Sequence, residues 1–124
     1  MAEPKWILDE VVVAIHRRQI AEHGGMDGVR DKRLLESTLI KPRNLYHFGT
    51  PKPYIAEIAA AYAYGIARNH AFVDGNKRTA LVIYLLFLKL NGIKLKADAS
   101  DKYQLFMKLA SGELMEVELA SWIA

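Results

Sequence analysis

The chain has 124 residues, of which 52% are hydrophobic, and it contains no cysteine. This size and composition suit one globular domain, residues 1–124, that buries about two thirds of its unfolded surface. The lack of cysteine excludes disulfides, thiolate catalysis and cysteine zinc sites, and it agrees with a reducing compartment. The net charge of +3 comes from 17 basic residues interspersed with 14 acidic ones, so we expect no direct binding of nucleic acid.

Neither a membrane span nor a secretory signal is expected. The longest apolar run, residues 80–88, stops at Lys89 and is shorter than the roughly 18 to 20 residues that a spanning helix needs. The first residues lack the basic segment, apolar stretch and cleavage site of a signal peptide. We therefore predict a cytoplasmic protein that does not bind membranes, in which the apolar run forms a buried core helix.

Two helices are expected in the first third of the chain. Asp9 can cap a helix over about residues 9–23, whose apolar residues recur at helical spacing before a pair of glycines. Asp31 can cap a shorter second helix, and Pro42 is expected to end it. Residues 41–53 contain three prolines and are expected to form a loop or flap.

Four more helices complete the predicted all-α bundle of about six. The alanine-rich segment 54–69 predicts a third helix, and the apolar segment 81–88 predicts a fourth, central helix that stops at an Asn-Gly pair. After a short extended piece at 93–95, Ser100 can cap a helix to about residue 111, and a last helix runs through Trp122.

The junction between the third and fourth helices contains the residues expected to carry chemistry. The N-terminus of a buried helix presents free N–H groups and the positive end of the helix dipole, so it favours anions and phosphate in particular. Lys77 and Arg78 lie in its first turn, where an anion between them would relieve their conflict with the dipole. Arg78 adds a planar fork for two phosphate oxygens, and Lys77 adds a mobile charge. Asn76 can cap the helix or donate its amide to the same ligand.

Upstream in this loop lie a candidate metal ligand and a candidate base. Asp74 is a hard oxygen ligand suited to Mg²⁺, which binds few carboxylates in nucleotide sites and completes its shell with phosphate oxygens and water. His70 has an unperturbed pKa near neutrality, which suits a general base for a hydroxyl. Phe72 is better explained as an apolar anchor that holds the loop to the core.

Each of these residues also has a purely structural explanation. A loop histidine is often structural, Asp-Gly-Asn is an ordinary turn, and Lys-Arg at a helix start is often only solvated. The combination is harder to explain in that way. A chance match to H-x-F-x-[D/E]-x-N-x-R in a chain of this length has a probability on the order of 10⁻⁴.

The segment His-Ala-Phe-Val-Asp-Gly-Asn-Lys-Arg, residues 70–78, resembles the Fic signature H-x-F-x-[D/E]-G-N-x-R-x-x-R. Residues 24–38, the helix ending in Ala-Arg-Asn-His, and Leu-Phe-Leu-Lys-Leu-Asn-Gly at 86–92 are similar to the death-on-curing (Doc) branch of the Fic/Doc family. The resemblance covers most of the chain and weakens after about residue 97. It implies the compact, single-domain helical Fic fold, with a central buried helix after the catalytic loop.

Two positions depart from the general Fic pattern in the way that the Doc branch does. Lys77 stands where nucleotide-transferring members have glycine, and Leu81 stands where they have a second arginine. Leu81 shares a helix face with Arg78, so a second phosphate contact is lost there. Doc-like toxins transfer the γ-phosphate of ATP to a threonine of elongation factor Tu and halt translation. The resemblance therefore implies a kinase toxin of a type II toxin-antitoxin pair.

The resemblance also implies a role for each residue of the loop. His70 would deprotonate the target hydroxyl, and Asp74 would hold Mg²⁺. The phosphates of ATP would be bound and polarised by the backbone and side chains of Gly75, Asn76, Lys77 and Arg78. Arg68, at the end of the third helix, is a further candidate phosphate contact, or alternatively only a favourable cation at a helix C-terminus.

Other functions and partners are open at this point. The self-inhibitory pattern [S/T]-x-x-x-E-[G/N] is absent, so a separate Phd-like antitoxin whose flexible tail folds onto the toxin is expected. A Fic-type nucleotidyltransferase that attaches AMP to a protein hydroxyl is one alternative, and a catalytically silent helical binding module is another. His16, His23 and His47 match no motif position and are expected to be structural or surface residues.

Overall fold

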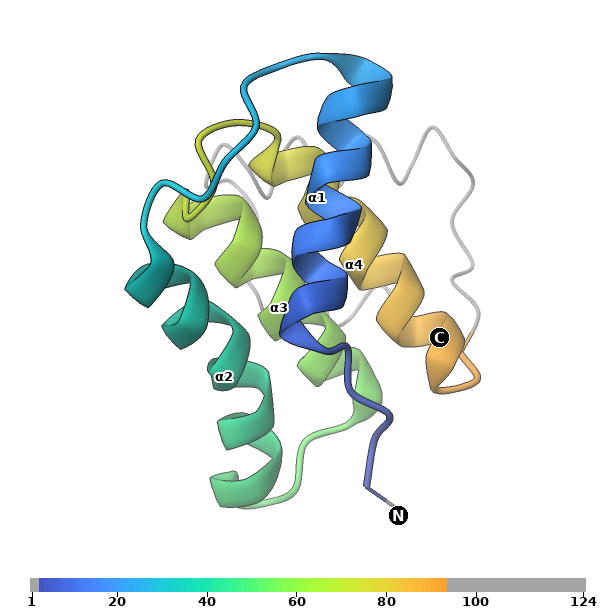
Figure 1. Cartoon of the computed structure of the whole chain (residues 1–124). Coiled ribbons are helices and arrows are strands. Elements are labelled where there is room, and N and C mark those ends of the chain that lie inside the picture. The colour runs from blue at the N-terminus through green and yellow to red at the C-terminus, as the bar shows by residue number, and fades with distance from the viewer. Residues whose placement is uncertain (1–2, 94–124) are drawn as a thin grey trace.

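Residues 3–93 are described in the computed structural model of the chain. They form α1 (Asp9–His23), α2 (Lys32–Phe48), α3 (Ile55–Asn69) and α4 (Asn76–Leu90). Helix α3 packs between α2 and α4, and α1 packs on α4 in front of it (Figure 1). Residues 3–93 contain no strand, only one isolated bridge between Val29 and Phe72, which confirms the predicted all-α class. The helices expected over 100–122 and most of the extended piece lie outside the described residues.

The centre of this part of the fold is formed by α3 and α4. In α3 an alanine-rich run from Ile58 to Ala63 is buried without interruption, and small side chains let the neighbouring helices approach closely. Tyr62 of α3 lies against Phe87 of α4 with ring centres 5.1 Å apart. Because Ile83 and Phe87 are fully buried, α4 is a core helix, as predicted. Among the described residues, no helix combines the length and hydrophobicity required to cross a membrane.

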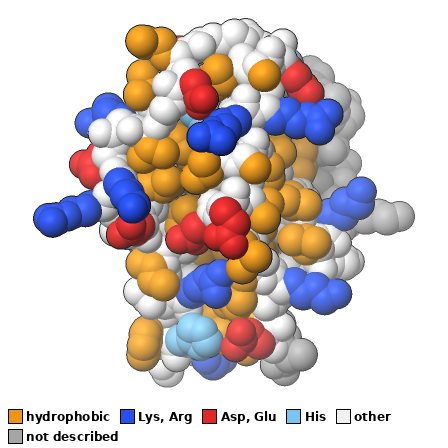
Figure 2. All heavy atoms as spheres, viewed as in Figure 1, with side chains coloured by type: hydrophobic (Ala, Val, Ile, Leu, Met, Phe, Trp, Pro, Cys, Tyr) orange, Lys and Arg blue, Asp and Glu red, His pale blue; other side chains and the backbone are white. Residues whose placement is uncertain are grey.

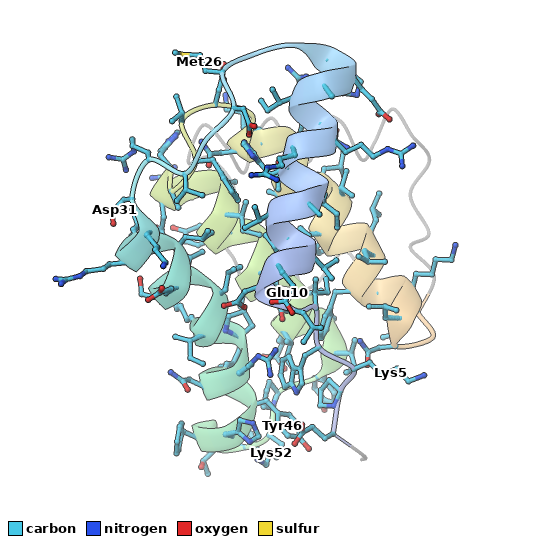
Figure 3. The ribbon with its side chains drawn as sticks, in the orientation of Figure 1. Lys5, Glu10, Met26, Asp31, Tyr46 and Lys52 are labelled. Atoms are coloured by element: carbon cyan, nitrogen blue, oxygen red, sulfur yellow. The ribbon has the colours of Figure 1, made fainter. Side chains whose placement is uncertain are left out.

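The predicted end of the second helix at Pro42 is wrong, because α2 continues through this residue. A proline inside a helix costs about 3 kcal/mol, since it lacks an N–H and crowds the preceding turn. Packing beyond Pro42 offsets this cost. Trp6 meets Tyr46 edge-on with ring centres 5.9 Å apart, and Lys52 Nζ lies 4.4 Å from the centre of the Tyr46 ring (Figure 3). The predicted loop over 41–53 is correspondingly shorter.

Of the two helix caps predicted in the first third of the chain, one is confirmed. Asp31 is the N-cap of α2, and its Oδ1 accepts a hydrogen bond from Leu34 N at 3.0 Å. The prediction for Asp9 is wrong, because Leu8 occupies the N-cap position of α1. Asp9 lies in the first turn instead, where its negative charge still faces the positive end of the helix dipole.

Candidate active site

The loop between α3 and α4 is bounded by two residues in the left-handed conformation. His70 is the C-cap of α3 with φ 54° and ψ 45°, and Gly75 is the N-cap of α4 with φ 74° and ψ 18°. Glycine adopts this conformation without penalty, whereas a residue with a Cβ pays about 1 to 2 kcal/mol. The structure around His70 must therefore hold its backbone in place.

The linker between α1 and α2, residues 24–31, provides this support. Arg30 N donates to the Ala71 carbonyl at 2.8 Å, and Val73 N donates to the Gly28 carbonyl at 3.0 Å. The side chain of Arg30 also donates from Nε to the His70 carbonyl at 2.7 Å. A cation thus satisfies a carbonyl at the end of α3, and the linker and the loop form one hydrogen-bonded unit.

Phe72 and Asn76 are buried and hold the loop against the core. Phe72 is 1% exposed, as expected for an apolar anchor. Asn76 is 7% exposed. Its side chain makes two hydrogen bonds to the backbone of Phe72: Oδ1 accepts from Phe72 N, and Nδ2 donates to the Phe72 carbonyl, both at 3.1 Å. The predicted cap at Asn76 is wrong, because Gly75 is the N-cap and the Asn76 carboxamide fastens the loop instead. A phosphate contact from Asn76 stays a prediction.

The Asp74 carboxylate is oriented by two main-chain donors. Its Oδ1 accepts from Gly75 N at 2.9 Å, and its Oδ2 accepts from Met26 N of the linker at 3.3 Å. Gly25 permits this approach, because a Cβ there would lie 2.8 Å from Asp74 Oδ2, and its φ of +113° favours glycine. The carboxylate itself is exposed at the surface of the loop.

The predicted site residues, except Arg68, come together around one pocket of about 310 Å³. Its wall is formed by His70, Val73, Asp74, Gly75, Asn76, Lys77 and Arg78. This volume is at the lower end of the range for small-ligand sites, roughly 300 to 1,000 Å³. Arg68 does not line the pocket; its guanidinium lies 6.0 Å from the centre of the Tyr64 ring, in the last turn of α3. That position fits its alternative role as a cation at a helix C-terminus.

The charge distribution of the pocket suits an anion with a bound cation. Lys77 and Arg78 are exposed in the first turn of α4, which contains no acidic residue. The free N–H groups of this turn and the helix dipole favour the same ligand. Within residues 3–93 no group of three or more His, Asp or Glu side chains could hold a metal. A single carboxylate, Asp74, fits Mg²⁺ that shares its shell with phosphate oxygens and water.

A larger hollow of about 650 Å³ lies elsewhere, between the start of α1 and α2. Its wall includes Asp9 and Glu36 as well as Arg33 and Arg43, and no residue of the 70–78 loop lines it. Figure 2 shows this face, where hydrophobic side chains lie among charges of both signs. We place the candidate site in the smaller pocket, because an imidazole, a carboxylate and two cations line it.

Sequence reasoning missed the contribution of α1 and the linker to this site. His16 is fully buried, its Nε2 lies 2.7 Å from the Asp74 carbonyl oxygen, and its ring stacks on Phe72. Arg30 reaches the His70 carbonyl from 40 residues away. Neither residue belongs to a local motif. The sequence signal for His16 is that it shares the buried face of α1 with Val12, where an apolar residue is expected.

Comparison with known proteins identifies the family. The sequence profile of the Fic/DOC family matches residues 6–88, a range that includes the whole 70–78 loop. The chain belongs to the Fic/Doc family. It is 34% identical over 110 residues to "Protein kinase doc" of Escherichia phage P1, covering 87% of this chain and 84% of that protein. It is 43% identical over 75 residues to "Toxin Doc" of Mycolicibacterium smegmatis, covering 60% and 58% of the two chains. These relatives place this Fic/Doc protein in the Doc branch.

Proposed function

We propose that this Fic/Doc protein is the toxin of a toxin-antitoxin pair and a protein kinase. It would transfer the γ-phosphate of ATP to a Ser or Thr hydroxyl, with elongation factor Tu as the substrate by resemblance, and so block translation. One observation carries the proposal: a single pocket is lined by an exposed imidazole, a carboxylate and two cations at a helix N-terminus. The relatives named as a kinase and as a toxin support it.

The residues of the pocket divide the reaction between them. His70 would accept the proton of the attacking hydroxyl as the new bond to the γ-phosphorus forms and the bond to the leaving ADP oxygen breaks. Lys77, Arg78 and the leading amides of α4 would stabilise the phosphate charge. Asp74 would hold Mg²⁺, which when bound neutralises phosphate charge. Arg30 and Asn76 would keep the loop in shape.

Leu81 supports phosphate transfer over AMP transfer. Its side chain is half-buried against the core and does not line the pocket, so α4 offers no second cation one turn after Arg78. The nucleotidyltransferase alternative draws support from the intact motif around Gly75.

A separate Phd-like antitoxin is the proposed partner, because one relative is named a toxin of the Doc type.

Labelled ATP distinguishes these activities. With purified elongation factor Tu and Mg²⁺, we expect label to move from γ-labelled ATP and not from α-labelled ATP. Mass spectrometry of the product then shows an added phosphate rather than an added nucleoside monophosphate. Transfer from α-labelled ATP alone would establish the nucleotidyltransferase reading, and no transfer from either would favour the silent binding module.

Lys77→Gly combined with Leu81→Arg is expected to shift the protein toward nucleotide transfer. Glycine would let the backbone approach the phosphates, and the arginine would add a second cation one turn after Arg78. The measurement is the ratio of product from α-labelled to product from γ-labelled ATP, which should rise at least severalfold. Circular dichroism must first show a folded variant, because glycine inside a helix costs about 1 kcal/mol. An unchanged ratio in a folded variant would contradict this account of the two positions.

A further inference from the structure

A buried histidine on α1 contacts the catalytic loop from beneath. His16 Nε2 lies 2.7 Å from the carbonyl oxygen of Asp74, which is 58 residues later in the sequence. A carbonyl oxygen can only accept a hydrogen bond, so Nε2 must carry the hydrogen. The contact therefore fixes the Nε2–H tautomer of His16.

The ring of His16 also contacts the loop on either side of Asp74. It stacks on Phe72 with ring centres 3.8 Å apart and an interplanar angle of 6°. A Cβ placed on Gly75 would lie 3.8 Å from His16 Cδ2 and Nε2, so the ring lies directly under this glycine. One side chain of α1 thus supports the loop from Phe72 to Gly75.

Stability alone gives little reason for a histidine at this position. His16 is fully buried, and its Nδ1 has no hydrogen-bond partner within residues 3–93; Asp27 Oδ1 lies 3.8 Å away. Burying an unpaired nitrogen is unfavourable, and a phenyl ring of similar shape would keep the stacking without that cost. What the histidine adds over a phenyl ring at the loop is the bond that Nε2 donates to the Asp74 carbonyl.

That bond clamps the peptide unit between Asp74 and Gly75. Its C=O accepts from His16, while its N–H donates to the Asp74 carboxylate Oδ1 at 2.9 Å. If this peptide rotated, the N–H that orients the carboxylate would move away together with the carbonyl. The orientation of Asp74 is therefore coupled to the imidazole of α1.

We propose that His16 is a positioning residue of the phosphotransfer site, acting through the Asp74–Gly75 peptide. Its effect on the reaction rests on the proposed function, since Asp74 is the residue assigned to Mg²⁺. Residues that orient a metal ligand from behind typically contribute about 10- to 100-fold to metal affinity or activity. We expect a loss of that size when the Nε2–H donor is removed.

Two substitutions separate the hydrogen bond from the ring. His16→Phe keeps the stacking on Phe72 and removes the donor, so it should remain folded at the assay temperature yet transfer phosphate about 10- to 100-fold more slowly. The Mg²⁺ concentration for half-maximal rate should rise as well. His16→Gln keeps an N–H donor near the same place and should recover part of the rate, although it loses the ring.

Val12→Ala is the matched control, because Val12 is fully buried on the same helix and outside the pocket wall. It should lower the unfolding temperature while leaving the rate and the Mg²⁺ dependence of the folded protein unchanged. Equal losses of rate in Val12→Ala and His16→Phe would show a merely structural role and overturn the proposal.

NMR of the free protein tests the clamp without any catalysis. The ¹⁵N shifts of His16 should show a protonated Nε2, and the Gly75 amide signal should shift in His16→Phe but not in Val12→Ala. The proposed hydrogen bond would be excluded if Nδ1 carried the hydrogen and Nε2 did not. It would also be excluded if the chemical shift of the Gly75 amide were the same in His16→Phe as in the wild type. If the wild type transfers no phosphate yet gives these signals, the proposed kinase function fails and the positioning of the loop is still supported.

Discussion

Replacing His70 by alanine is expected to slow phosphate transfer by about 10²- to 10⁴-fold, which is the usual contribution of a positioned general base. The imidazole is exposed on the wall of the pocket, and no other histidine lines it. The initial rate with γ-labelled ATP measures the loss, and the growth of cells that express the variant measures the loss of toxicity. Unchanged toxicity would point to the silent binding module instead.

Two further variants make this result specific to the imidazole. Alanine at a φ of 54° strains the backbone, whereas asparagine tolerates the left-handed conformation, so His70→Asn should lose the rate without the strain. His23→Ala removes an exposed histidine from the end of α1 and should leave the rate unchanged. A His70→Asn variant that retained the wild-type rate would exclude His70 as the base.

Phe72→Ala is expected to cost about 3 to 5 kcal/mol of folding free energy, the usual range for a buried aromatic ring. The ring is 1% exposed, stacks on His16 and lies in the loop that Asn76 fastens. Small domains have only about 5 to 15 kcal/mol of stability, so the variant loses a large share of it. Urea unfolding followed by circular dichroism measures the change.

Phe48→Ala provides the comparison for the same chemical change at the surface. Phe48 is 80% exposed at the end of α2, so its truncation should change stability by no more than about 0.5 kcal/mol. If Phe72→Ala were as mild as Phe48→Ala, Phe72 would not anchor the loop.

The sequence predicted those parts of the structure that depend on neighbouring residues. The bounds of α1 and α3, the core position of α4 and the cap at Asp31 follow from local spacing and propensity. The pocket residues were also predictable, because they are contiguous and the start of a core helix brings them together. The continuation of α2 through Pro42 was not, since the packing of Trp6 on Tyr46 joins residues far apart in the chain.

The supporting residues of the site escaped prediction for the same reason. His16 and Arg30 contact the loop across 58 and 40 residues, and no spacing rule connects positions at such a distance. The donor from Met26 is a main-chain N–H, so its side chain carries no trace of the contact. The residues that line the pocket are contiguous in the sequence, whereas the residues that support the loop come next to it only in the folded chain.

The Asp74 carboxylate, held by the main-chain N–H groups of Gly75 and Met26, has a consequence for affinity. Because these contacts restrict its rotamer before any ligand binds, a cation held by Asp74 would cause little further loss of conformational entropy, and more of the contact energy would appear in the dissociation constant. By mass action the linkage would be mutual: a ligand that binds this site only in the folded protein would raise the melting temperature as the ligand concentration rises.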